Sequence, residues 1–294
     1  MTKILITGGS GFIGRNVKEF LSKTYPEYEI KAPASRELDC LDETAVTQYL
    51  RLHKFDFILH FAVYSKRPDN QKDNRQMVSY NLRIFWNFAK NSYLYGKMFY
   101  LGSGAEYDKR GPIVQVEEEA IGATIPIDDY GLMKYTIGQA IERSANIYNL
   151  RLFGIFGKYE YYPLKFISNV CCKAIKNLPL TIRQDVCFDY LWIDDFCRML
   201  IWFLQNEPSF HSYNLVSGQR ILLSEICRIV LEVSGKSLPI IICRDGLGNE
   251  YTAQCNRYRS ECPQFIHTPI EESIAQLYQW YEKKADIDLY QLIY

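Results

Sequence analysis

A tyrosine and a lysine four residues apart, Tyr130 and Lys134, are the side chains of this sequence best suited to acid–base chemistry. Side chains four apart on a helix lie on the same face, one turn apart. An ammonium group beside a phenol stabilises the phenolate, which lowers the pKa of the tyrosine from about 10 toward neutrality. We therefore expect Tyr130 to exchange a proton with a carbonyl or an alcohol, and Lys134 to lower its pKa. The alternative is a chance spacing on a solvated helix face, because the chain has 23 tyrosines.

A glycine-rich turn near the start of the chain indicates a dinucleotide site. Residues 3–6 are a short apolar run typical of a strand, and an amphipathic pattern typical of a helix follows residue 14. Between them, glycines at every third position allow a tight turn, close approach of a pyrophosphate and close packing of helix on strand. The helix N-terminus adds free N–H groups and a partial positive charge. We expect the cofactor to contact this turn at Gly8, Ser10, Gly11, Phe12, Ile13 and Gly14.

Strands alternate with helices after this turn, which predicts a doubly wound parallel α/β sheet of the Rossmann type. The expected strands are residues 28–32, 55–61, 98–101 and 150–153, and the expected helices are residues 77–95 and 128–148. Ligands of such a sheet bind beyond the carboxyl ends of the strands. Ser103 follows one expected strand, and Phe61 and Ala62 lie at the end of another. We therefore expect all three residues at the same edge as the glycine turn.

The length of the chain allows one large domain with a smaller lobe attached to it. We assign residues 1–157, together with about 186–205, to the dinucleotide-binding Rossmann domain. Residues 158–185 and 206–294 are assigned to a smaller, mixed α/β lobe that binds the substrate. No linker, repeat or low-complexity tract separates the two.

The composition argues against several classes of protein. The 34 basic and 34 acidic side chains cancel, so neither nucleic acid nor an anionic membrane is expected as a partner. Nine scattered cysteines have neither the spacing of a metal site nor that of a disulfide framework, so we expect no metal. We recognise no signal peptide and no apolar run of transmembrane length, and we expect a cytoplasmic protein.

Several motifs recur in order along nearly the whole chain and carry a family resemblance. They are the glycine turn, residues 56–62, Asn81, Ser103 four residues before Tyr107, the Tyr130–Lys134 pair, and the segments 188–195, 213–218 and 269–281. Together they resemble the extended short-chain dehydrogenase/reductase family, in its branch of NAD(P)-dependent epimerases, dehydratases and reductases of sugar nucleotides. Within that branch the chain is most similar to 4-keto reductases of the GDP-fucose synthase type.

This resemblance implies a role for each matching residue. Tyr130 would be the general acid or base, while Lys134 would lower its pKa and hold the nicotinamide ribose. Ser103 would donate a hydrogen bond to the substrate oxygen. Asn81 would make a backbone or water contact near the bound substrate, and an ordinary helix-face asparagine fits this position equally well. Hydride transfer to a ketone develops an alkoxide, which needs a proton donor and hydrogen-bond donors around it.

The residues after the second expected strand favour NADPH as the cofactor. NAD-binding folds place an Asp or Glu there to bind the ribose hydroxyls, whereas this chain has Ser35 and Arg36 and no carboxylate before Glu37. A hydroxyl and a guanidinium suit a 2′-phosphate. The alternative is that Arg36 is a solvated loop charge, and NAD is the less favoured cofactor. By the family resemblance, Asp39 and Cys40 lie in the loop that lines the adenine pocket, with Asp39 accepting from the adenine amine.

Departures from the family pattern narrow the reaction. Dehydratases of this branch have a Thr-Asp-Glu triplet that begins where this chain has Ser103. Here Gly104 and Ala105 follow, so dehydration is not expected, and we expect Glu106 to point elsewhere. GDP-fucose synthases have a cysteine at the position of Ala105 and a histidine at the position of Lys165. Without that pair, epimerisation at carbon loses its acid and base, while ketone reduction keeps the groups that it needs.

The expected reaction is NADPH-dependent reduction of a keto group, at C4, of a nucleoside-diphosphate sugar in deoxysugar or surface-polysaccharide biosynthesis. The usual arginine of the family is replaced by Phe188, so we consider Lys165, Arg183 and Arg257 as cations that bind the substrate. Two alternatives remain open: a 4-epimerase that retains NAD, and a non-catalytic dinucleotide-binding sensor or scaffold. The family resemblance also predicts a homodimer.

Overall fold

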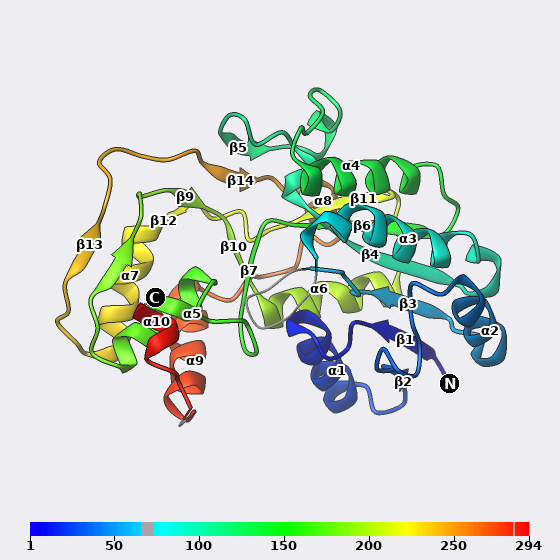
Figure 1. Ribbon diagram of the computed structural model, residues 1–294, viewed down its shortest axis with the longest axis horizontal. Helices are drawn as coiled ribbons and strands as arrows, with labels where there is room; N and C mark the ends of the chain where they lie inside the picture. The colour runs from blue at the N-terminus through cyan, green and yellow to red at the C-terminus, as the bar shows by residue number, and fades with distance from the viewer. Residues whose placement is uncertain (66–72, 285, 294) are drawn as a thin grey trace.

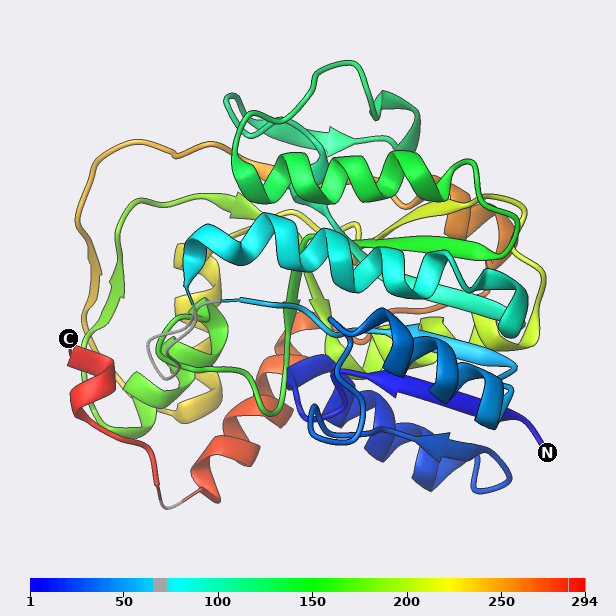
Figure 2. The same cartoon turned by 45° about the vertical axis from the view of Figure 1, so that its right-hand side comes forward.

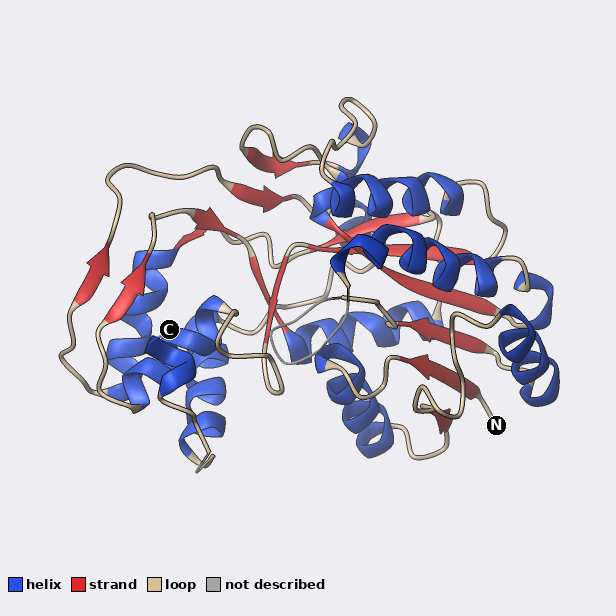
Figure 3. Ribbon diagram, in the orientation of Figure 1, coloured by secondary structure: helices blue, strands red, loops and turns tan. Residues whose placement is uncertain are grey.

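A six-stranded, fully parallel sheet forms the larger lobe of the computed structural model, which describes residues 1–65, 73–284 and 286–293 (Figure 1, Figure 3). The strand order is β2-β1-β3-β4-β6-β11, so the direction of winding reverses between β1 and β3. Such a switch point opens a crevice at the carboxyl ends of the strands. The strands are β1 (Lys3–Thr7), β2 (Glu29–Lys31), β3 (Phe57–His60), β4 (Lys97–Ser103), β6 (Ile147–Leu152) and β11 (Ser212–Leu215).

Helices cover both faces of this sheet, because the apolar residues of each strand point alternately to one face and the other. In β1, Ile4 and Ile6 pack against one helical layer and Leu5 packs against the other. The first layer contains α1 (Phe12–Thr24) and α6 (Ile193–Gln205), and the second contains α2 (Glu43–His53), α3 (Met77–Ala89) and α4 (Asp129–Ile141). Figure 2 shows α3 and α4 side by side. The predicted doubly wound α/β fold is confirmed.

Two helices are shorter than the sequence pattern predicts. The helix expected over 77–95 ends at Ala89, and the helix expected over 128–148 ends at Ile141. The hydroxyl of Ser144 donates to the Ile141 carbonyl at 2.7 Å, and such local side-chain bonds compete with helical hydrogen bonding. The apolar residues that follow form strand β6 instead. Within the described part of the chain, no helix has both the length and the apolar character needed to cross a membrane.

The smaller lobe combines a group of helices with short strands (Figure 1). Its helices are α5 (Phe166–Ile175), α7 (Leu223–Ser234), α9 (Ile270–Glu282) and α10 (Tyr290–Ile293), while α8 (Asn256–Glu261) packs on β11. A two-stranded sheet pairs β8 (Leu180–Ile182) with β13 (Ile240–Ile242), and another pairs β7 (Gly154–Phe156) with β10 (Tyr190–Trp192). A four-stranded sheet has the order β12 (Ile221–Leu222), β9 (Cys187–Phe188), β14 (Tyr251–Ala253) and β5 (Ile113–Val116).

Several strands cross the predicted boundary between the lobes, and β11 and β5 show this most clearly. Strand β11 falls in the segment 206–294 that was assigned to the smaller lobe, yet it is the sixth strand of the central sheet and pairs with β6. Strand β5 falls in the segment 1–157, yet it pairs with β14 in the four-stranded sheet. Each of these two strands crosses the boundary because the hydrogen-bond partners of its backbone, in β6 for β11 and in β14 for β5, lie on the other side of it.

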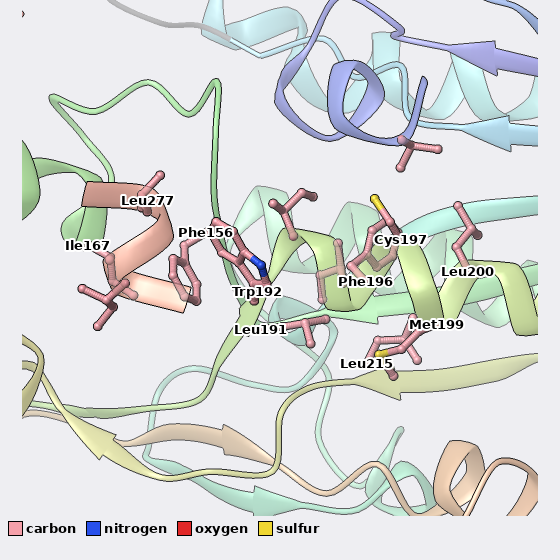
Figure 4. Packing of buried hydrophobic residues seen from close by; sticks show 14 of the residues in the cluster. Phe156, Ile167, Leu191, Trp192, Phe196, Cys197, Met199, Leu200, Leu215 and Leu277 are labelled. Atoms are coloured by element: carbon pink, nitrogen blue, oxygen red, sulfur yellow. The ribbon is translucent and has the colours of Figure 1, made fainter. Parts of the chain in front are cut away.

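One apolar core runs through both lobes. The ring centroids of Phe156 and Trp192 are 5.1 Å apart. Figure 4 shows these two side chains in contact, with Phe196 of α6 on one side and Leu277 of α9 on the other. Because residues of both lobes bury their surface in the same cluster, the lobes are held together by hydrophobic packing.

A buried ion pair joins the end of β4 to β6. Arg151 Nε donates to Glu106 Oε2 at 2.6 Å, and both side chains are fully buried. The same carboxylate accepts from Asn149 Nδ2 at 2.9 Å and from the Ser103 backbone N–H at 3.1 Å. Glu106 ends a short 3₁₀ turn, η3 (Gly104–Glu106), that directly follows β4. The ion pair therefore holds the strand end on which Ser103 stands.

We expect Arg151→Met to lower the free energy of unfolding by about 3–5 kcal/mol, because the substitution leaves the Glu106 carboxylate buried without its countercharge. Chemical denaturation of the full chain measures this loss. Arg220→Met is the matched control, since it breaks an ion pair with Glu250 at the surface and should cost much less. Equal losses in the two variants would contradict this interpretation of the buried pair.

Candidate active site

The glycine turn connects β1 to α1 at the carboxyl edge of the central sheet. Gly8 has a φ of +68°, and a Cβ atom there would lie 2.8 Å from the Ala62 nitrogen. A Cβ atom at Gly14 would lie 2.3 Å from the Gly8 carbonyl oxygen. The turn therefore packs tightly against both the helix and the loop after β3, which requires glycine at these positions. The first N–H groups of α1 point out of this turn and can bind an anion.

A cleft of about 440 Å³ opens beside this turn, where the connections after β1 and β3 lead to opposite faces of the sheet. Pockets of this size hold small molecules. Among the residues predicted from the sequence, the structure brings the following onto the cleft: Gly8, Gly11, Phe12, Ile13, Gly14, Phe61, Ala62, Ser103, Tyr130, Lys134 and Lys165. Ser10 is exposed on the turn itself.

Ser103 and Tyr130 meet on one wall of the cleft. Tyr130 lies in the first turn of α4, where the N-cap Asp128 accepts a hydrogen bond from the Gly131 N–H at 2.9 Å. Ser103 is the last residue of β4 and lines the cleft beside Tyr130, because the start of α4 packs against the turn that follows Ser103. Its Oγ accepts from the Ala105 N–H at 3.1 Å. The end of a strand and the start of a helix thus bring two hydroxyl groups together.

Lys134 reaches the same wall from the next turn of α4. Its ammonium donates to the Tyr100 hydroxyl at 2.8 Å and to the Leu101 carbonyl at 2.7 Å. It lies 5.9 Å from the centre of the Tyr130 ring. Burial lowers the pKa of Lys134 to about 8, while the carboxylate of Glu106 acts to raise it. Most Lys134 side chains are therefore charged at neutral pH.

The pKa of Tyr130 corrects one expectation from the sequence. Burial raises this pKa, the hydrogen bond with Ser103 lowers it, and two nearby carboxylates raise it further. Lys134 makes its short contacts elsewhere, so the net pKa of Tyr130 is raised in this arrangement and not lowered as expected. Tyr130 is a neutral phenol at neutral pH, which is the form that donates a proton.

The residues predicted to select the cofactor lie on the loop after β2, which packs against the glycine turn. Ser35 and Arg36 are exposed there. The Asp39 carboxylate accepts from the Leu41 N–H at 2.9 Å. Burial raises the pKa of the Cys40 thiol to about 12, so this cysteine is not a thiolate. None of the four lines the cleft described above, and their contacts to a cofactor stay predictions.

Asn81 supports the loop after β3. Its Oδ1 accepts from the Tyr64 N–H, and its Nδ2 donates to the carbonyls of Tyr64 and Met77, each at 2.8 Å. These contacts agree with the backbone contact near the site that the family resemblance implies, and a direct contact of Asn81 to the substrate stays a prediction. Asn81, on α3, therefore holds the loop after β3 in position.

The three cations predicted to bind the substrate lie in different places. Lys165 is exposed at the cleft, at the N-cap of α5. Arg183 is exposed after β8 in the smaller lobe and does not line the cleft. Arg257 donates to the Ser212 carbonyl at 2.9 Å and pairs with Glu119, at the amino end of β11. The structure therefore brings neither arginine to the cleft. Arg183 lies in the smaller lobe away from it, and Arg257 is paired at the amino end of β11, whereas the cleft lies at the carboxyl ends of the strands.

Three residues near the site were missed by the sequence analysis. Tyr251 of β14 places its hydroxyl beside Gly104, the residue that follows Ser103. Lys109 Nζ lies 5.8 Å from the centre of the Tyr130 ring and 5.9 Å from that of Tyr251. Glu160 lines the cleft, and burial raises the pKa of its carboxyl to about 7. No motif marks these residues in the sequence. Tyr251 and Glu160 come from a short strand and a loop of the smaller lobe, which have no recognisable local pattern.

Sequence comparison finds a known family over most of the chain. The profile of the NAD dependent epimerase/dehydratase family matches residues 4–215. Among individual proteins, GDP-L-colitose synthase of Yersinia pseudotuberculosis is 23% identical over 257 residues, which make up 79% of this chain and 82% of that protein.

Solved structures share the fold. The GDP-mannoheptose C4 reductase of Campylobacter jejuni, with NADP bound, has a TM-score of 0.80 at 19% identity, over 96% of this chain and 98% of that chain. The GDP-L-fucose synthetase of Naegleria fowleri, bound to NADP, has a TM-score of 0.81 at 17% identity, over 95% of this chain and 92% of that chain. At these identities the likeness establishes the arrangement of strands and helices.

We expect Gly14→Ala to lower the free energy of unfolding by about 1–3 kcal/mol, because its Cβ would press on the Gly8 carbonyl and force the turn open. Binding of NADPH should weaken as well, since the same turn would face the pyrophosphate. Gly111→Ala is the matched control, because a Cβ there meets nothing within 4 Å. Urea denaturation and fluorescence titration with NADPH measure the two effects. Wild-type behaviour of Gly14→Ala in both assays would show that the turn tolerates a side chain.

Proposed function

This chain belongs to the NAD dependent epimerase/dehydratase family, and on that premise we propose that it reduces the C4 keto group of a nucleoside-diphosphate sugar with NADPH. The observation that carries this proposal is the gathering of Ser103, Tyr130 and Lys134 on the wall of one cleft that the glycine turn borders. The relatives support it, because one is a GDP-sugar synthase and another is a C4 reductase of a GDP-sugar. The biosynthesis of a deoxysugar or a surface polysaccharide is the proposed setting.

NADPH would lie along the glycine turn. Gly8 and Gly14 allow the tight turn that leads into α1, and the N-terminus of α1 would supply N–H groups to bind the pyrophosphate. On the adjacent loop, Ser35 and Arg36 would bind the 2′-phosphate. Both structural neighbours were solved with NADP. Bound NADPH would supply the hydride.

Tyr130 would act as the proton donor of the reduction. As the carbonyl carbon gains a hydride, its oxygen becomes negative and takes the phenolic proton of Tyr130. Ser103 donates a hydrogen bond to the same oxygen and so stabilises the developing charge. The ammonium of Lys134, on the same wall, then stabilises the phenolate that is left. The product is an alcohol, and the phenolate regains a proton from solvent.

The residues next to Ser103 argue against more elaborate chemistry. Gly104 has no side chain, Ala105 is fully buried, and the Glu106 carboxylate is turned into the interior, where it binds Arg151. Dehydration, or epimerisation beside the ketone, needs an acid and a base at such positions. Reduction needs only the proton donor and the hydrogen-bond donor that the cleft presents.

Lys165 is the cation that we assign to the diphosphate of the substrate. It is exposed at the cleft, where the N-terminus of α5 adds a partial positive charge. A cation at this point would attract the diphosphate while the sugar faces Tyr130. A homodimer and a cytoplasmic location stay predictions from the sequence.

We expect Tyr130→Phe to lower the rate of ketone reduction by about 10²–10⁴-fold with NADPH affinity nearly unchanged, because the proton donor is lost and the ring is kept. The assay follows NADPH absorbance with a panel of nucleoside-diphosphate 4-keto-6-deoxy sugars. Tyr135→Phe, on the same helix, is the control. An unaltered rate in Tyr130→Phe would contradict the mechanism. Interconversion of 4-epimers without net NADPH use would favour the epimerase, and tight NADPH binding without turnover would favour a sensor or scaffold.

We expect kcat/KM for the keto sugar, at saturating NADPH, to fall as the pH rises through about 8, where Lys134 loses its charge. The sign follows from the lowered pKa of Lys134, because the ammonium is present below that pH and lost above it. The raised pKa of Tyr130 keeps the phenol protonated over the same range. Lys134→Arg stays charged and should abolish the fall, at a lower overall rate. A wild-type profile that stays flat well above this pH would contradict the assignment.

A further inference from the structure

A second phenol reaches the reacting groups from the four-stranded sheet. Tyr251 stands on β14, which is held between β5 and β9. Its ring packs against Phe153 and Phe188, with centroids 4.9 and 5.7 Å away. This packing places the hydroxyl beside Gly104, the residue that follows Ser103. The hydroxyl groups of Tyr251, Ser103 and Tyr130 therefore gather around the carboxyl end of β4.

The absence of a side chain at Gly104 makes this approach possible. A Cβ atom there would lie 2.4 Å from the Tyr251 hydroxyl oxygen and 2.6 Å from Phe153 Cδ1. Real Cβ atoms do not approach other atoms so closely, so any larger residue would push the phenol away from Ser103. The position of the Tyr251 hydroxyl thus requires a glycine at residue 104, although the two residues are far apart in the sequence.

The hydrogen-bonding capacity of Ser103 gives this contact a consequence. A serine hydroxyl donates one hydrogen bond and accepts two. The Ala105 N–H already occupies one lone pair of Ser103 Oγ, at 3.1 Å. Burial raises the pKa of Tyr251, which keeps its hydroxyl protonated and able to donate to the second lone pair. The proton of Ser103 is then left to point toward Tyr130 and the cleft.

We propose that Tyr251 is a positioning residue, whose hydroxyl donates to Ser103 and so directs the Ser103 proton toward the carbonyl oxygen of the substrate. This rests on the proposed reduction at Ser103 and Tyr130. A donor that is itself hydrogen-bonded is also polarised, which strengthens the bond that it gives to the developing alkoxide. The four-stranded sheet thereby completes a hydroxyl chain whose other members come from the central sheet and α4.

A double-mutant cycle on turnover tests this role. Tyr251→Phe should lower kcat by about tenfold while Ser103 is present, and should have no further effect in Ser103→Ala. The KM for the keto sugar and the affinity for NADPH should stay at wild-type values in Tyr251→Phe, which a merely structural defect would not spare. Gly104→Ala should reproduce the loss of kcat. Additive losses in the double mutant would overturn the proposal.

Tyr107→Phe is the matched control for the loss of a phenol. Tyr107 also packs against Phe153, with centroids 5.9 Å apart, but its hydroxyl donates to Asn214 Oδ1 at 3.0 Å. We expect Tyr107→Phe to keep the wild-type kcat. A loss equal to that of Tyr251→Phe would assign both effects to packing.

A second cycle, on the midpoint of thermal unfolding, does not depend on turnover. Tyr251→Phe should lower the midpoint when Ser103 is present and leave it unchanged in Ser103→Ala, because the shared hydrogen bond is then already lost. If the wild-type protein oxidises NADPH with none of the sugars, the proposed function fails, and this cycle still decides whether the two hydroxyls interact. If turnover depends on Tyr130 but both cycles are additive, only the role of Tyr251 fails.

Discussion

The buried ion pair between Glu106 and Arg151 is the interaction on which the site depends. It ties the end of β4 to β6 with a 2.6 Å contact, and its carboxylate also accepts the Ser103 N–H. Removing two charges from water costs several kcal/mol per ion, and within the described chain Arg151 Nη1 and Nη2 have no hydrogen bond. We therefore interpret the pair chiefly as a positioning device, which holds the serine where α4 delivers its tyrosine.

The same carboxylate also sets the charges of the site. Burial removes much of the preference of Lys134 for its charged form, and the negative charge of Glu106 restores part of it, with a resulting pKa of about 8. Glu106 acts on Tyr130 in the same direction and helps to keep the phenol protonated. One buried anion thus favours the two protonation states that proton donation requires: a neutral phenol, and a cation ready to stabilise its phenolate.

The two lobes are joined more closely than a division by residue number suggests. β5 and β11 each lie in a sheet whose other strands come mainly from the other side of the predicted boundary, and a single apolar core continues from β1 to α9. Because of this exchange, Tyr251 and Phe153 approach Ser103 as parts of a packed structure, and not as parts of a mobile lid. The position of Tyr251 follows from strand pairing, which leaves no local motif.

The sequence by itself determined the features that depend on local backbone geometry. Gly8 has a left-handed backbone conformation, and Gly14 leaves no room for a Cβ atom beside the Gly8 carbonyl. The spacing of Tyr130 and Lys134 places both on one helix face. The carboxyl edge of the sheet follows from strand alternation, and with it the place of Ser103. Tertiary structure decided what depends on partners distant in the chain: the lobe of β11, the pairing of Arg257 away from the cleft, the raised pKa of Tyr130 and the position of Tyr251. Burial and long-range pairing set these properties, and neither is encoded in the spacing of neighbouring residues.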